Sequence, residues 1–191
     1  MLRIIAGQWR GRRWRFVEAA DLRPTPDRVR ETLFNWLSPF IVDARCLDLF
    51  AGSGALGLEA LSRGAAHVTF VEREKRAAQA IGELLRDWMG GAEALNRSEV
   101  IAGDSLQYLA RAPKPFTCVF LDPPFASSLA DAAIVRLSRG WLAPGALVYL
   151  ERPAAAPLAD LPHGWAVRRT KQAGEVGYHL LEFSAAGAGL E

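Results

Sequence analysis

The chain of 191 residues is half apolar and 23% charged, a composition that excludes a disordered protein and fits one domain with a full core. Its apolar runs are all shorter than the about 20 residues of a membrane span, and its net charge of +2 favours no partner by itself. The two cysteines, Cys46 and Cys118, lie in apolar runs and have no metal-binding spacing. We therefore expect a cytoplasmic protein with buried free thiols, no bound metal and no membrane contact.

Residues 1–20 are predicted to form a basic β-hairpin arm outside the main sheet, because residues 2–7 and 11–17 alternate like strands around a glycine-containing turn. Eight arginines and only three acids fall within residues 1–30, a distribution typical of a nucleic-acid partner. Two interpretations stay open. The aromatic side chains either attach the arm to the core or stack on RNA while the arginines contact phosphates, and the one-sided charge favours the second. The candidate phosphate contacts are Arg3, Arg10, Arg12, Arg13, Arg28 and Arg30.

The first helix is predicted to start after a proline-rich turn. Thr25 is a good N-cap, Pro26 suits the first helical position, and Asp27 suits the positive end of the helix dipole. Apolar residues at helical spacing continue to Leu37, and Ser38 and Pro39 end the pattern.

Residues 46–61 form the stretch around which the rest of the chain is organised. A short apolar run ends in a Gly-x-Gly turn and continues with helix formers, which predicts the first strand, glycine loop and helix of an open α/β sheet. Gly52 and Gly54 let the backbone approach a ligand, and Gly57 lets the helix pack tightly on its strand. The same glycine pattern also occurs in NAD- and FAD-binding folds.

Asp48 favours one ligand class over the others. A carboxylate four residues before the first glycine would repel a pyrophosphate but attract a cationic sulfonium. Asp-x-Phe-x-Gly-x-Gly resembles the first motif of S-adenosylmethionine (SAM) methyltransferases. This likeness makes the loop a SAM-binding candidate, formed by Asp48, Phe50, Ala51, Gly52, Ser53, Gly54 and Gly57.

Two later acids are placed to hold a nucleoside. Residues 66–72 read as the second strand, and Glu72 at its tip can accept both ribose hydroxyls, with Arg73 beside it. A helix over residues 75–88, a break at Gly90 and an irregular stretch are expected to follow. Asp104 and Ser105 come just after a third strand at 99–102, and Asp104 either accepts the adenine amine or simply caps a helix over 106–111.

Residues 116–121 form an almost entirely apolar run, which predicts the buried central strand of a parallel sheet. It leads directly into Asp122-Pro123-Pro124-Phe125. The prolines rigidify the turn and remove two N–H donors. A carboxylate and a fixed carbonyl can then hold the two hydrogens of an exocyclic base amine, while the aromatic ring stacks on the base. We expect these four residues to form the catalytic site.

The Asp-Pro-Pro-Phe sequence resembles the motif of methyltransferases that act on exocyclic amines of nucleic-acid bases. Residues 4–12, 22–37 and 47–61 extend the likeness, and together these segments resemble the bacterial 16S rRNA guanine-N2 methyltransferases of the RsmD type, from Arg3 to about Glu182. The resemblance implies SAM as donor and one guanine of 16S rRNA as acceptor, within a small ribosomal subunit or its assembly intermediate. It implies that the residues named above hold the cofactor, with Thr25 near its methionine end, and that Asp122 to Phe125 hold the base.

The remaining pattern completes one fold. A helix over 129–139, a fifth strand over 146–151 and an antiparallel hairpin of 165–170 and 176–183 are expected, and residues 184–191 are expected to be a flexible tail. We predict a monomer whose residues 21–183 form an α/β, Rossmann-like, doubly wound sheet of seven strands, with the small N-terminal β-hairpin outside it. Rival interpretations are a DNA adenine-N6 or cytosine-N4 methyltransferase, an NAD-dependent oxidoreductase, and an RNA-binding module with a vestigial cofactor loop.

Overall fold

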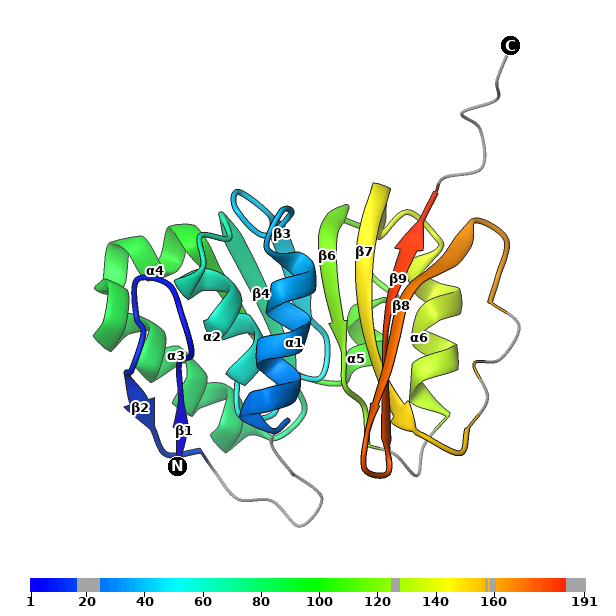
Figure 1. Ribbon diagram of the computed structural model, residues 1–191. Coiled ribbons are helices and arrows are strands. Elements are labelled where there is room, and N and C mark those ends of the chain that lie inside the picture. Colours follow the sequence, from blue (N-terminus) through cyan, green and yellow to red (C-terminus); the bar gives the residue numbers. More distant parts are fainter. Residues whose placement is uncertain (17–24, 125–127, 157, 159–160, 185–191) are drawn as a thin grey trace.

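The computed structural model describes residues 1–16, 25–124, 128–156, 158 and 161–184, and its centre is a seven-stranded sheet in the order β5-β4-β3-β6-β7-β9-β8. The first five of these strands are parallel, and β9 and β8 continue the sheet antiparallel. The predicted architecture is therefore confirmed (Figure 1). The strands are β3 (Arg45–Asp48), β4 (His67–Glu72), β5 (Ser98–Ala102), β6 (Phe116–Leu121), β7 (Leu142–Pro153), β8 (Trp165–Ala173) and β9 (Val176–Phe183).

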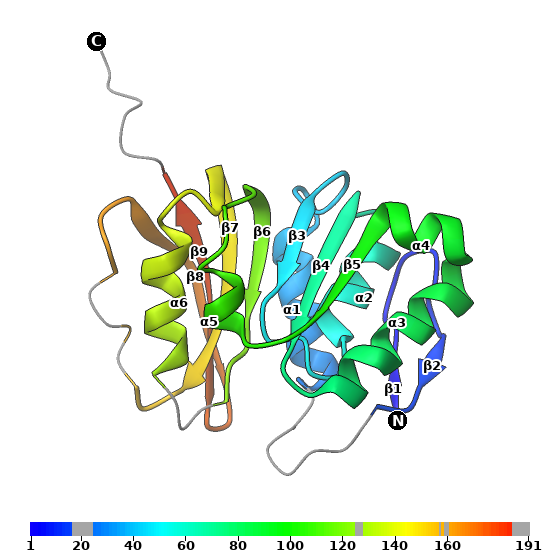
Figure 2. The same ribbon diagram turned by 180° about the vertical axis from the view of Figure 1, so that it is seen from behind.

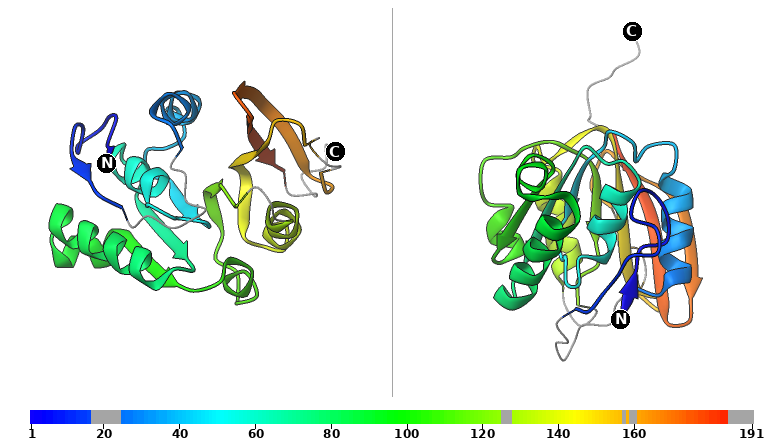
Figure 3. Two further views of the ribbon diagram at one scale, coloured as in Figure 1. Left: turned by 90° about the horizontal axis from the view of Figure 1, so that it is seen from below. Right: turned by 90° about the vertical axis from the view of Figure 1, so that its left-hand side faces the viewer.

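Helices cover both faces of the sheet. The helices are α1 (Asp27–Leu37), α2 (Ala55–Ser62), α3 (Lys75–Met89), α4 (Gly91–Arg97), α5 (Ser105–Tyr108) and α6 (Leu129–Leu137). The apolar cluster on one face joins α1, α2 and α3 to the sheet, and the cluster on the other face joins α5 and α6 to it. Figure 2 shows α5 and α6 in front of the sheet, and the left view of Figure 3 shows α1 and α6 on opposite sides of it.

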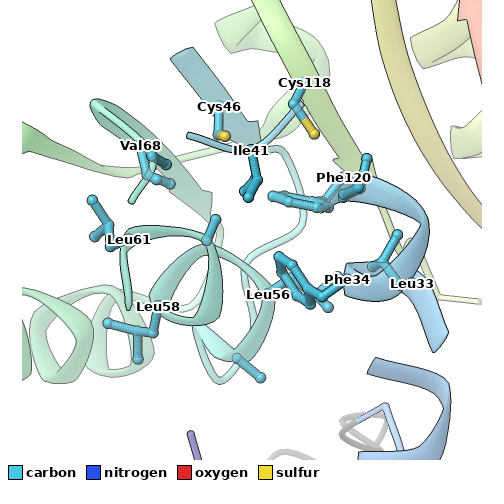
Figure 4. Close-up of a cluster of buried hydrophobic side chains, with 14 of the residues drawn as sticks. Leu33, Phe34, Ile41, Cys46, Leu56, Leu58, Leu61, Val68, Cys118 and Phe120 are labelled. Atoms are coloured by element: carbon cyan, nitrogen blue, oxygen red, sulfur yellow. The ribbon is translucent and has the colours of Figure 1, made fainter. Parts of the chain in front are cut away.

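The first face is packed by large side chains from distant parts of the sequence. Leu33 and Phe34 of α1 reach Leu56 of α2 and Phe120 of β6 (Figure 4), and the Phe34 and Phe120 rings lie 5.9 Å apart. Each fully buried side chain of this size stabilises the fold by about 1.5–3 kcal/mol. This packing holds α1 against the sheet at β6.

The N-terminal arm is a separate two-stranded sheet, as predicted, but its strands β1 (Leu2–Arg3) and β2 (Arg13–Trp14) have two residues each. The buried carboxylate of Glu59 on α2 holds the arm by accepting the Ile5 and Ala6 N–H groups at 2.8 and 3.0 Å. A buried charge that accepts two backbone N–H groups makes a strong local anchor. The arm is consequently part of the folded body rather than a loose extension.

The structure differs from the predicted elements in two places. The stretch after Gly90 was expected to be irregular, but it forms the helix α4. Gly90, at φ 81°, only changes the direction of the chain. A Glu93–Arg97 ion pair of 2.8 Å then spans one turn of the new helix. Thr25 does not cap α1: Pro26 occupies the N-cap position without a side-chain hydrogen bond. The predicted boundary at residue 20 and the tail residues 185–191 lie outside the described residues.

Candidate active site

The glycine loop lies between β3 and α2, at the edge where the parallel strands end. Gly52 and Gly54 adopt φ angles of 52° and 76°, a region that favours glycine. A Cβ atom at Gly57 would come within 2.2 Å of the Phe70 ring, so the helix packs on β4 as closely as the sequence predicts. Ser53 is buried, and its carbonyl accepts the Trp14 indole N–H at 3.1 Å, so the arm supports the loop directly.

Asp48 is the last residue of β3 and its side chain is buried. Its Oδ2 atom accepts the Gly57 N–H at 3.0 Å, which ties the strand end to the first turn of α2. The pKa of Asp48 is raised to about 7, chiefly by burial and to a smaller extent by the nearby Glu72 carboxylate, while the Gly57 hydrogen bond opposes the rise. A cation placed beside Asp48 would relieve this penalty.

Glu72 lies at the tip of β4, where its two carboxylate oxygens accept the Gly52 and Glu74 N–H groups, each at 2.7 Å. The carboxylate is therefore fixed against the glycine loop, and each oxygen keeps one further lone pair for a ligand. Arg73 follows it on the exposed turn, while Phe50 is half-buried and Ala51 is buried within the loop.

Asp104 and Ser105 follow β5. Asp104 caps α5 by accepting the Gln107 N–H at 2.9 Å, which was one of the two expected roles. The buried Ser105 hydroxyl donates to the Leu49 carbonyl at 2.7 Å and so joins α5 to the segment after β3.

Asp122 stands directly after β6, on the face of the sheet that α1 covers. The Thr25 hydroxyl, just before α1, donates to Asp122 Oδ2 at 3.1 Å. This contact explains why Thr25 does not serve as the N-cap. Burial raises the pKa of Asp122 well above its ordinary range, and the negative charge of Glu151 adds to the effect, whereas the Thr25 hydrogen bond opposes it. Pro123 is buried and Pro124 is exposed; Phe125 lies outside the described residues.

Sequence reasoning missed two residues of this site, Glu151 and Tyr149 on β7. Leu121 pairs with Leu150, so Asp122 and Glu151 occupy the next positions on neighbouring parallel strands. Glu151 is buried and accepts the Tyr149 hydroxyl proton at 2.7 Å. The available signal was an acid at the end of an apolar strand, but only the strand order places it beside Asp122.

The structure corrects the expectation for Arg30. Its side chain is fully buried and donates to the Arg3 carbonyl at 2.9 Å and to Asp27 Oδ1 at 2.6 Å, while Glu59 lies 3.7 Å away. A guanidinium enclosed among these partners cannot reach a phosphate, so Arg30 is structural. The reason is the buried Glu59 charge, which is distant in sequence and needs a cation to balance it.

The other arginines of the expected nucleic-acid surface are exposed but divide between two ends of the molecule. Arg3 pairs with Asp27 at the start of α1, and Arg28 and Arg13 lie nearby along the strand-end edge of the sheet. Arg12 reaches the Trp88 carbonyl near the end of α3, and Arg10 is in the same turn of the arm, which places both at the opposite edge. Only Arg3, Arg13 and Arg28 therefore flank the candidate site.

The tryptophans of the arm do not face solvent, so the expected stacking of these rings on RNA is wrong. Trp9 and Trp14 are both 4% exposed and contact the Trp88 ring edge-on at 5.3 and 5.7 Å. Such aromatic pairs contribute about 0.5–1.5 kcal/mol beyond their burial. The aromatic side chains attach the arm to α3, while the arginines around them stay in solvent.

The cysteines, the possible metal ligands and a surface groove were also compared with the candidate site. Cys46 and Cys118 are buried free thiols on neighbouring strands, as expected. No group of metal-ligating side chains occurs among the described residues, and none of the helices within them could span a bilayer. A surface groove between α5 and α6, around Trp141, contains none of the predicted site residues and lies on the other face of the sheet.

Comparison with known proteins agrees with this arrangement. A family described as "Conserved hypothetical protein 95" matches residues 2–182. The chain belongs to this family. The Escherichia coli (strain K12) protein named "Ribosomal RNA small subunit methyltransferase D" is 46% identical over 187 residues, which cover 97% of this chain and 92% of that protein.

Solved structures agree on the fold. An Escherichia coli structure that is 44% identical superposes with a TM-score of 0.88 and covers 96% of this chain and 98% of that one. The RNA methyltransferase from Salinibacter ruber, solved in complex with S-adenosyl-L-homocysteine, is 18% identical, has a TM-score of 0.62 and covers 85% of this chain and 94% of that one. The architecture of this family member is thus the Rossmann-like fold of SAM-dependent methyltransferases.

Proposed function

We propose that the protein transfers a methyl group from SAM to the exocyclic N2 amine of a guanine in 16S rRNA. The carrying observation is that Asp122, before two prolines, directly follows the strand next to the one that ends at Asp48. Cofactor and acceptor sites would then lie side by side at one edge of the sheet, as a direct transfer requires. The Escherichia coli relative named for the small-subunit rRNA supports this acceptor.

The residues around the glycine loop fit SAM. Gly52 and Gly54, at positive φ, let the backbone approach a ligand, Gly57 lets α2 pack against Phe70, and the start of α2 faces the same edge. The buried Asp48 carboxylate, whose pKa is raised to about 7, would be stabilised in its charged form by a neighbouring cation. Glu72 would accept the ribose hydroxyls, and Asp104 the adenine amine. When bound, the cofactor supplies an activated methyl group on its sulfonium sulfur. Phe50, Ala51, Ser53, Arg73 and Ser105 complete the proposed cofactor site.

Asp122 and the Pro123 carbonyl would hold the acceptor amine. Two hydrogen bonds from the amine fix its orientation and draw its lone pair away from the ring, which makes the nitrogen a better nucleophile. The Thr25 hydroxyl donates a hydrogen bond to Asp122, so Thr25 belongs to the part of the site that would hold the base. It also borders the proposed methionine end of the cofactor. Phe125 is proposed to stack on the base.

Arg3, Arg13 and Arg28 are the proposed phosphate contacts at the edge where the base would enter, and Arg10 and Arg12 would meet RNA only if it extends along the arm. A substrate as large as a small ribosomal subunit could span both ends. We propose that the protein acts on it as a cytoplasmic monomer.

A transcript of the acceptor region in which inosine replaces guanosine tests the choice of atom, because inosine lacks only the N2 amine. The guanosine transcript, or subunits rebuilt with it, should accept methyl groups from labelled SAM, and the inosine transcript should not. Asp122→Asn should abolish labelling of the guanosine transcript while SAM binding, measured by calorimetry, stays unchanged. Equal labelling of the two transcripts would refute the N2 assignment.

A further inference from the structure

Asp122 and Glu151 form a pair of carboxyl groups at the ends of two neighbouring strands. The cross-strand pair Leu121–Leu150 precedes them, and each carboxyl group affects the ionisation of the other. Glu151 is 4% exposed, so solvent screens its charge poorly. Two adjacent carboxyl groups in such a setting do not both ionise.

The neighbours of the pair donate hydrogen bonds but bring no positive charge. Thr25 donates to Asp122 Oδ2 at 3.1 Å, and Tyr149 donates to Glu151 Oε1 at 2.7 Å. Among the described residues, neither carboxyl has an Arg, Lys or His within ion-pair distance. Two other titratable groups face the pair: Asp48 at the end of β3, and Tyr178 on β9, which is the cross-strand partner of Glu151. An ionised Asp48 adds further negative charge.

Burial raises the pKa values of both Asp122 and Glu151. The charge of Glu151 raises the pKa of Asp122 further, whereas hydrogen bonds from Tyr149, Thr25 and Asp122 limit the rise at Glu151. Tyr149 responds in the same direction, because burial and the charge of Glu151 raise its pKa and keep its hydroxyl a donor. The pair therefore carries one proton and one negative charge near neutral pH.

We propose that Glu151 is a positioning residue that takes up this proton when an acceptor amine binds, so that Asp122 is ionised and aimed at the amine. The inference rests on the proposed function. An amine that donates a hydrogen to Asp122 favours its charged form, which moves the shared proton to Glu151. The protonated Glu151 then donates to one side of Asp122 while Thr25 donates to another, and the carboxylate cannot rotate away from the base.

The pair also accounts for the proton released by the reaction. The amine nitrogen forms its bond to the methyl carbon, and the electron pair of the broken sulfur–carbon bond stays on sulfur. The nitrogen becomes cationic and then loses one N–H proton to Asp122. The pair is neutral after this step and returns to its singly charged state when one proton passes to solvent.

The first test is an infrared spectrum of the free protein at pH 7. The spectra are compared in an Asp48→Asn background, because Asp48 has a pKa of about 7 and adds a carboxyl band of its own. In that background the carbonyl stretch of a protonated carboxyl group should be present when Asp122 and Glu151 are intact and missing after Asp122→Asn/Glu151→Gln. An Asp48→Asn protein without this band would overturn the shared proton. The spectrum is recorded without RNA, so its result does not depend on whether guanine is the substrate.

The second test separates a proton held by Glu151 from a structural role. Single-turnover transfer rates are measured against pH at saturating SAM for Glu151→Gln, which keeps a hydrogen-bond donor, and for Glu151→Leu, which has none. Glu151→Leu should lower the rate roughly a hundredfold or more with unchanged SAM affinity, whereas Glu151→Gln should lower it by less than about tenfold. The wild-type rate should fall at alkaline pH, where the pair loses its one remaining proton. The rate of Glu151→Gln should not fall in this way.

Three results would overturn the proposal. Equal losses in both variants would mean that Glu151 acts through its charge rather than its proton. An alkaline fall that persists in Glu151→Gln would assign that ionisation to another group. A Glu151→Leu variant with the wild-type rate and profile would leave Glu151 without a role in transfer.

Discussion

Replacing Glu59 with alanine is expected to destabilise the protein by about 3–5 kcal/mol, the cost of removing one partner from a buried ion pair. The fully buried carboxylate accepts two backbone N–H groups of the arm, pairs with Arg63 at 2.7 Å and balances the buried Arg30. Alanine would leave these donors and the Arg30 charge without their acceptor. For a domain of this size each kcal/mol lowers Tm by roughly 2–4 °C, so Tm should fall by about 6–20 °C.

Urea unfolding followed by circular dichroism measures the effect, with Glu93→Ala as the matched control. Glu93 also pairs with an arginine four residues later, at 2.8 Å, but on the surface, where such pairs contribute about 0.3–0.5 kcal/mol. Near-equal losses in the two variants would refute the reasoning, because they would mean that the arm does not depend on the buried charge.

Further predictions concern ligand binding. SAM, a cation, should lower the raised pKa of Asp48, so binding should release a proton near pH 6 and should tighten as pH rises towards the pKa of about 7; calorimetry in buffers of different ionisation enthalpy measures this release, and an unchanged proton count would contradict it. Glu72→Ala should weaken SAM by roughly 1.5–3 kcal/mol, with turnover restored at saturating SAM; unchanged affinity would remove Glu72 from the cofactor site. Arg13→Gln and Arg28→Gln should each flatten the plot of log K for RNA against log salt by about 0.7–0.9, and Arg10→Gln should do so less if RNA contacts mainly the strand-end edge. Equal slopes in all three would show that the edge does not bind RNA preferentially.

The sequence predicted the strands well where their apolar runs were continuous. Residues 116–121 were identified as a central strand with the bounds that β6 has, because a parallel strand covered on both faces must be apolar throughout. The α4 helix was missed for a local reason. Two consecutive glycines usually end a helix, and here Gly90 ends α3 while Gly91 already begins the next one.

Side-chain environments were predicted less well, because they depend on residues distant in the sequence. Arg30 resembles any polar residue of an amphipathic helix until Glu59 is placed opposite it. Trp9 and Trp14 fit an RNA-stacking surface equally well until α3 brings Trp88 into contact with both buried rings. Glu151 can be placed beside Asp122 only when β6 and β7 are known to be neighbours in the sheet.

The identity of the methylated nucleoside decides whether the protein is a guanine-N2 methyltransferase of rRNA. The protein would be incubated with SAM carrying an isotopically labelled methyl group and with 16S rRNA, assembled small subunits or DNA, and each nucleic acid would then be digested and analysed by mass spectrometry. The account predicts labelled N2-methylguanosine from the rRNA, from one position, and none after Asp122→Asn. Label in N6-methyladenosine or N4-methylcytosine, or in DNA but not in rRNA, would contradict it.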